Sequence, residues 1–104
     1  MSEDWSFFLR PQWILAAENF RRSGEEKNLR IGSTIIQIAT GDHSFYASSV
    51  VNETYGITIF SAGTAESFVE KLISFIDTLR EKESIENLED ILPELDSFFD
   101  EYLP

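Results

Sequence analysis

The sequence predicts an α+β fold in a single domain, with a three-stranded antiparallel meander packed by helices in the order α-β-β-β-α-α. Residues 64–82 carry apolar side chains at steps of three and four, the period of an amphipathic helix. The middle of the chain holds three β-branched runs whose connections are too short for a crossover helix, so neighbouring strands pair antiparallel. A length of 104 residues fits one domain, residues 1–104.

Residues 1–10 support two interpretations. The alternation of Trp5, Phe7 and Leu9 favours a short strand or an extended arm. Ser2, with acidic residues behind it, instead suits the cap of a helical turn. The sequence does not choose between them.

A first helix is predicted over residues 12–23. Pro11 suits the first turn of a helix because its missing N–H would have no partner there. Gly24 is a natural C-terminal stop. The apolar side chains at helical spacing are Trp13, Ala16, Ala17 and Phe20.

Three β-strands are predicted over residues 29–39, 45–51 and 57–61. Each run is rich in β-branched or aromatic residues, and turn-forming residues separate the runs. Side chains alternate between the two faces of a strand. In the last run, strict alternation therefore points Ile59 to one face and Phe60 to the other.

The helix at residues 64–82 is the element around which the others are expected to pack. Thr64 suits the N-cap, and the helical pattern fades over residues 80–83. A wide apolar arc predicts that this helix lies across the sheet with most of one side buried. The arc consists of Ala65, Phe68, Val69, Leu72, Ile73, Ile76 and Leu79.

A last helix is predicted to begin at Asp90, which can cap it, with Pro93 in the first turn, where proline is tolerated. One continuous helix from Ser84, kinked at Pro93, is the alternative; the break is preferred. The predicted buried face consists of Ile91, Leu95, Phe98, Phe99 and Tyr102.

The net charge is −11 and is unevenly placed. Residues 1–65 carry seven acidic and five basic side chains, whereas residues 66–104 carry twelve and three. Such a field repels nucleic acid and anionic membranes and attracts a basic protein partner. The absence of cysteine, of a long apolar run and of a secretion signal predicts a cytoplasmic protein.

No catalytic, cofactor or metal motif appears in the sequence. The sole histidine, His43, lies in a turn beside Asp42 and Ser44, and adjacent residues of one turn do not converge as a catalytic triad must. With one histidine and no cysteine, a metal site is not expected. Residues 61–64 precede a helix, but one glycine and no lysine do not make a phosphate-binding loop. We therefore expect no enzyme, no cofactor and no metal.

The acidic side chains are the candidate functional residues. Some form like-charge pairs four residues apart, each of which costs a helix roughly 0.2–0.5 kcal/mol. The pattern fits either a solvated surface that serves solubility or a surface shaped for a basic partner. The candidate partner-binding residues are Glu66, Glu70, Asp77 and Glu81 on the central helix, and Glu94, Asp96, Asp100 and Glu101 on the last helix.

In length, charge, lack of cysteine, α+β layout and these acidic stretches, the chain resembles bacterial immunity proteins of contact-dependent growth inhibition and other polymorphic-toxin systems. The resemblance implies a non-catalytic antitoxin that covers the basic active-site cleft of a cognate toxin, often a nuclease. A cleft built to hold phosphates is positive, so carboxylates can occupy it in place of nucleic acid.

Two other classes fit the same sequence. A nucleic-acid mimic that inhibits a DNA-binding protein would space its acids like phosphates along an elongated surface. The immunity class would show a compact patch with aromatic anchors such as Tyr55 or Tyr102. A non-catalytic, homo-oligomeric interaction domain would use the surplus Phe and Trp at a symmetric interface.

Overall fold

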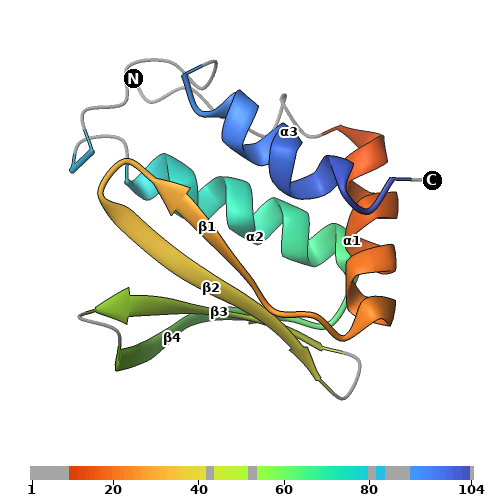
Figure 1. The fold of residues 1–104 in the computed structure, drawn as a ribbon, viewed down its shortest axis with the longest axis horizontal. Helices are drawn as coiled ribbons and strands as arrows, with labels where there is room; N and C mark the ends of the chain where they lie inside the picture. The colour runs from red at the N-terminus through yellow and green to blue at the C-terminus, as the bar shows by residue number, and fades with distance from the viewer. Residues whose placement is uncertain (1–9, 42–43, 52–53, 80–81, 84–89, 104) are drawn as a thin grey trace.

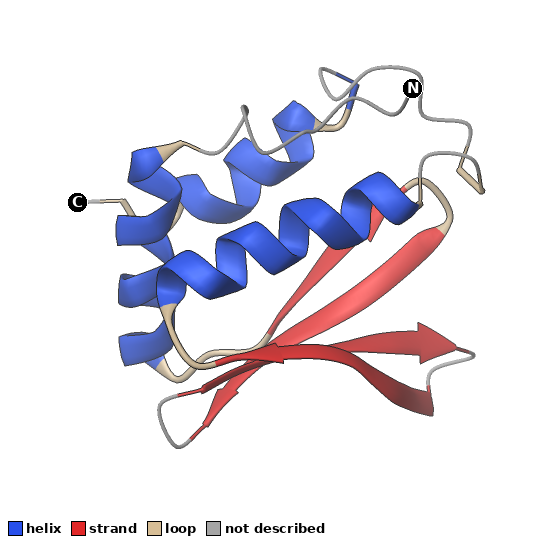
Figure 2. Ribbon diagram, turned by 180° about the vertical axis from the view of Figure 1, so that it is seen from behind, coloured by secondary structure: helices blue, strands red, loops and turns tan. Residues whose placement is uncertain are grey.

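All three helices lie on one face of a single antiparallel sheet (Figures 1 and 2). The structure is a computed structural model that describes residues 10–41, 44–51, 54–79, 82–83 and 90–103. Its elements are α1 (Pro11–Ser23), β1 (Lys27–Ile31), β2 (Thr34–Gly41), β3 (Ser44–Val51), β4 (Thr54–Ala62), α2 (Ala65–Thr78) and α3 (Leu92–Asp100). The strands are ordered β1-β2-β3-β4, so the predicted α+β class and antiparallel meander are confirmed.

The prediction of three strands is wrong: the sheet has four, and the element order is α-β-β-β-β-α-α. The run at residues 29–39 is not one strand but a hairpin in which Ile31 pairs with Thr34. Gly32 and Ser33 form its two-residue loop, and Gly32 has a φ of +61°, which glycine adopts without strain. A Gly-Ser pair between β-branched residues is typical of a two-residue β-hairpin turn. This turn could therefore have been predicted from the sequence.

The core lies between the helices and the inner face of the sheet. The ring of Phe68 on α2 stacks on that of Phe45 on β3 with the centroids 4.5 Å apart, and both side chains are fully buried. The ring of Phe20 on α1 lies 5.6 Å from that of Phe98 on α3. Aromatic contacts therefore join α2 to the sheet and α1 to α3, and each ring buries a large area.

Strand β4 departs from the strict alternation predicted for it. Ile59 and Phe60 are consecutive, yet both are partly buried and pack against the core. The register changes here: Ala47 pairs with Phe60, but the next residue, Ser48, pairs with Thr58. A β-bulge leaves one residue without a partner and alters which way the neighbours point. The prediction that Ile59 and Phe60 face opposite ways is thus wrong.

Helix α2 begins where the sequence predicts, and α1 begins at Pro11, one residue before its predicted start. The Thr64 hydroxyl accepts a hydrogen bond from the Ser67 N–H at 3.1 Å, so Thr64 is the N-cap of α2. Gly24 ends α1 with a φ of 70°. Helix α2 ends at Thr78, somewhat before the predicted fade.

Helix α3 begins one residue later than predicted. Its N-cap is Ile91, which makes no side-chain capping hydrogen bond, and not Asp90. Pro93 lies in the first turn as expected. The predictions for residues 1–9 and for residues 84–89, including the continuous helix from Ser84, lie outside the described residues.

A single carboxylate ties the β1–β2 turn to the chain that follows α2. Glu83 accepts hydrogen bonds from the Ser33 N–H at 2.8 Å, the Ser33 hydroxyl at 2.9 Å and the Thr34 hydroxyl at 2.5 Å. These donors, the backbone N–H first, hold the pKa of Glu83 below its ordinary value. A Cβ at position 32 would overlap this carboxylate, which is a second reason for Gly32.

Replacing Phe68 with alanine should destabilise the fold by about 3–5 kcal/mol, because the change leaves a cavity between α2 and the sheet. Urea denaturation followed by circular dichroism measures the loss. The control is Leu15→Ala, at a side chain that is 49% exposed, which should shift the free energy of unfolding by less than about 0.5 kcal/mol. Equal losses in the two variants would contradict the packing described here.

Glu83→Gln should destabilise the protein at neutral pH and matter less in acid. Since the folded-state pKa of Glu83 is lowered, its contribution is present above the unfolded-state pKa and is lost as the pH falls through the folded-state value. Urea titrations of both proteins at pH 7, 5 and 3 should show the difference in unfolding free energy shrinking toward pH 3. A difference independent of pH would show that the carboxylate charge is not what matters.

Candidate interaction surface

The predicted acidic residues come from two helices and differ in exposure. Helix α3 lies nearer the viewer in Figure 1, whereas α2 lies nearer the viewer from behind, in Figure 2. Both helices carry exposed acids. Those on α2 are Glu66 and Glu70, and those on or next to α3 are Glu94, Asp100 and Glu101. Asp77 and Asp96 are half-buried, and Glu81 lies outside the described residues.

Asp96 has a structural role within the fold. Its Oδ1 accepts a hydrogen bond from Arg10 Nη1 at 2.8 Å and another from Trp13 Nε1 at 3.3 Å. The Arg10 guanidinium also lies 5.3 Å from the Trp13 ring centroid. Asp96 thus ties α3 to the start of α1.

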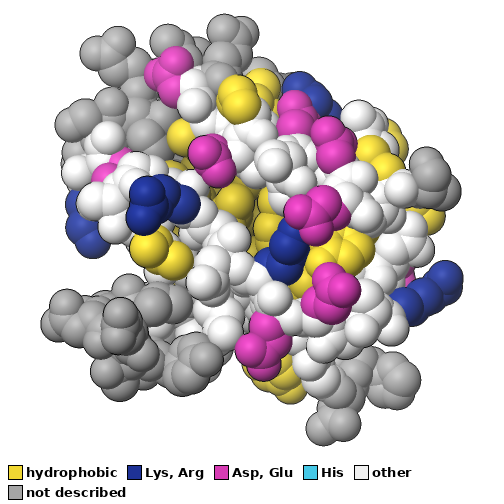
Figure 3. All heavy atoms as spheres, in the orientation of Figure 1, with side chains coloured by type: hydrophobic (Ala, Val, Ile, Leu, Met, Phe, Trp, Pro, Cys, Tyr) yellow, Lys and Arg dark blue, Asp and Glu magenta, His cyan; other side chains and the backbone are white. Residues whose placement is uncertain are grey.

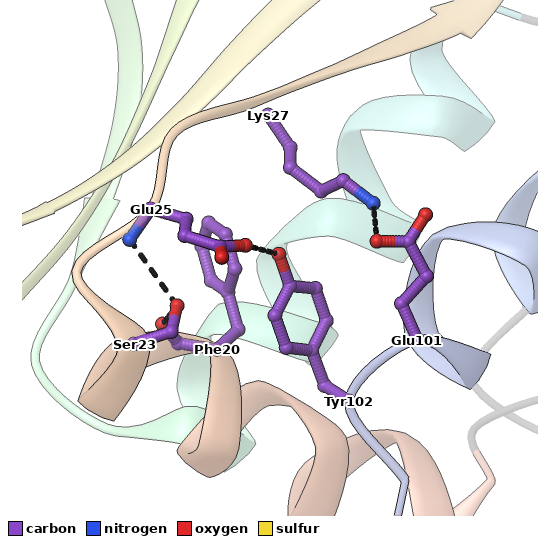
Figure 4. A network of polar contacts seen from close by, with 6 residues as sticks. All are labelled: Phe20, Ser23, Glu25, Lys27, Glu101 and Tyr102. Carbon is purple, nitrogen blue, oxygen red and sulfur yellow. Dashed lines mark hydrogen bonds and ion pairs between the residues drawn. The ribbon is translucent and has the colours of Figure 1, made fainter.

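The end of α3 meets the connection between α1 and β1 in a network of charged and aromatic side chains (Figure 4). Glu101 forms an ion pair with Lys27, and the Tyr102 hydroxyl donates a hydrogen bond to Glu25. The Lys27 ammonium also lies 5.3 Å from the Tyr102 ring centroid and 5.9 Å from that of Phe98. A cation held this way is attracted both by the carboxylate and by the ring faces.

The environment of Tyr102 keeps its phenol protonated. Burial raises the pKa of Tyr102 well above its ordinary value, and the hydrogen bond to the Glu25 carboxylate and the nearby negative charges raise it further. The hydroxyl therefore remains a donor to Glu25 across the physiological range. Of the two aromatic anchors suggested by the sequence, Tyr102 is half-buried in this network; the side chain of Tyr55, on β4, is outside the described part.

A cavity of about 210 Å³ opens between β1 and α3. It is lined by Lys27, Asn28 and Leu29 from β1 and by Glu94, Ser97, Phe98 and Glu101 from α3 and its end. We call this cavity the β1–α3 groove. Within the described ranges, the Glu94 carboxylate forms no hydrogen bond or ion pair, whereas the Glu101 carboxylate is paired with Lys27. The two ends of the groove thus differ: one carboxylate is neutralised internally and the other has no partner in the described part of the chain.

Figure 3 shows, as filled spheres, the face of the molecule that is seen in Figure 1. Acidic side chains are spread across it in a band, Lys and Arg side chains are set among them, and hydrophobic side chains are visible in between. Glu25 and Lys27, which were not among the predicted site residues, contact Tyr102 and Glu101 respectively. Nothing local in the sequence indicates a contact between residues 25–27 and the chain end.

The structure also bears on other site types. Among the described residues, no three His, Asp or Glu side chains are close enough together to hold a metal ion. None of the helices in the described part is long and apolar enough to cross a membrane. His43 and Asp42 lie outside the described residues.

Comparison of the chain with protein-family models, with curated proteins and with solved structures finds no match.

Proposed function

We propose that this protein is a toxin-neutralising immunity protein: a non-catalytic antitoxin that binds a cognate toxin domain in the cytoplasm and blocks its basic active site. A nuclease is the toxin class that fits best, because a cleft that holds phosphates is positively charged. The observation that carries the proposal is the exposed pair Glu94 and Asp100 on α3, whose carboxylates have no partner among the described residues. Carboxylates without internal partners bind a cationic surface without first breaking a native contact.

The α3 side supports this role better than the α2 side. Glu66 and Glu70 on α2 are also exposed and have no partner in the described part. The α3 side adds a groove and, near its acids, the half-buried side chain of Tyr102. Binding energy in protein interfaces concentrates on aromatic anchors in pockets, with charge supplying rate and specificity.

The shape of the molecule favours an immunity protein over a nucleic-acid mimic. Its extents of 36, 33 and 21 Å describe a broad body and not a rod. Its exposed candidate carboxylates come from two separate helices, α2 and α3. A mimic of duplex DNA needs acids in a long regular row, since the phosphates recur about every 3.4 Å along each strand.

The proposal predicts that this protein protects cells against the toxin encoded beside its gene. Co-expression with that toxin domain should restore growth, and the double variant Glu94→Lys/Asp100→Lys should fail to do so. Its affinity for the toxin should fall at least about thirtyfold, the equivalent of roughly 2 kcal/mol for charge reversal at an interface. Isothermal titration calorimetry with catalytically inactive toxin measures this.

The matched control is Glu66→Lys/Glu70→Lys, which changes the net charge by the same amount on α2. This variant should keep protection and lose less than about threefold in affinity. Equal losses in both variants would mean that only the overall charge matters. Failure of the wild-type protein to protect against the adjacent toxin would overturn the immunity function.

A further inference from the structure

We infer that the β1–α3 groove is a subsite for one basic side chain of a protein partner, with arginine preferred, and that Glu94 is the carboxylate that receives it. The inference rests on the proposed function only in naming the partner as a basic toxin domain; the groove and its charge belong to this chain. Three properties support this assignment: the size of the groove, the placement of charge in it, and the chemistry of its walls.

The size of the groove fits a side chain and not a cofactor. Sites for drug-sized ligands and cofactors enclose about 300–1,000 Å³, and this groove has about 210 Å³. It is also open to solvent along α3, where Glu94 and Ser97 are exposed. A side chain projecting from a docked protein surface can therefore enter it without any movement of the fold.

The charges in the groove select one cation. Glu94 and Glu101 both line it and lie seven residues apart, about 10 Å along a helix. The ammonium of Lys27 already occupies the Glu101 end, held by that carboxylate and by the faces of Phe98 and Tyr102. A second cation at that end would meet a fixed like charge. The Glu94 carboxylate has no partner in the described part of the chain and receives the incoming cation.

The walls of the groove suit a guanidinium. Leu29 and Phe98 lie buried behind them and expose little apolar surface, so the accessible walls are mostly polar. Asn28 and Ser97 supply polar groups beside the carboxylate of Glu94. A guanidinium has five N–H donors in a planar fork and uses several acceptors at once, whereas an ammonium is a compact and more strongly hydrated charge. Arginine is therefore the better occupant.

Lys27 acts in this site as a selectivity residue. Its removal frees Glu101 and turns a site for one cation into a site for two. Lys27→Met keeps most of the aliphatic stem that packs against the rings and removes only the charge. The variant should thus bind a peptide with two arginines more tightly than the wild-type protein does, which no general loosening of the fold would produce.

The test is a titration of the full-length, ¹⁵N-labelled protein with capped Gly-Arg-Gly and Arg-Gly-Arg peptides, followed by NMR at low and moderate salt. Amide shifts should concentrate at Asn28, Leu29, Ser97 and Phe98. Glu94→Gln should weaken binding of Gly-Arg-Gly by roughly threefold, the scale of an exposed charge pair, whereas Glu66→Gln, with the same change in charge, should leave it nearly unchanged. The spectrum of each variant reports whether it is folded.

A second comparison uses Lys27→Met and Arg22→Met, which remove one positive charge each, the latter from an exposed residue outside the groove lining. Only Lys27→Met should strengthen binding of Arg-Gly-Arg, by roughly threefold. Amide shifts spread evenly over α2 and α3 would overturn the inference. Equal effects of Glu94→Gln and Glu66→Gln, or of Lys27→Met and Arg22→Met, would also overturn it. Peptide binding at the groove without protection against the adjacent toxin would overturn the proposed function alone, and protection without binding at the groove would overturn the inference alone.

Discussion

The packing of α2 against the sheet is the interaction on which the rest of the structure depends. Phe68 stacks on Phe45 and lies 6.2 Å from Phe60, so one ring of α2 contacts both β3 and β4. The chain has no cysteine to cross-link these layers. Cohesion therefore comes mainly from buried apolar area. With α2 in place, α1 packs against it, and α3 is held in turn by α1 and β1.

This order of packing explains why a groove forms beside α3. The ring of Phe99 stacks on that of Trp13 at 5.2 Å, and Phe98 contacts Phe20, so the buried side of α3 is committed largely to α1. Its other flank runs along β1, where Lys27 and Glu101 meet. A short helix anchored strongly on one side cannot also close fully over a neighbouring strand, and the space left there is lined by polar side chains.

Features set by neighbouring residues were predictable from the sequence, and features set by distant contacts were not. The buried face of α2 and its Thr64 cap follow from spacing within one helix, and both appear as predicted. The bulge in β4 depends on pairing with β3, which strict alternation along one strand does not contain. The contact of Asp96 with Arg10 joins residues 86 positions apart. For this reason the role of Asp96 as a tie between helices could not be predicted from the sequence.

The placement of Lys27 bears on how an acidic protein avoids binding every basic one. A surface of carboxylates alone attracts any cation, and its affinity varies little with the details of the partner. Specificity is a difference between affinities and often requires an element that repels the wrong partner. The Lys27 ammonium is held in place by Glu101 and two aromatic rings, so it cannot move aside without loss of those contacts. A partner with a cation opposite this point is penalised, whereas one with a cation opposite Glu94 is not. The fixed positive charge of Lys27 thus makes binding depend on where the partner carries its positive charges.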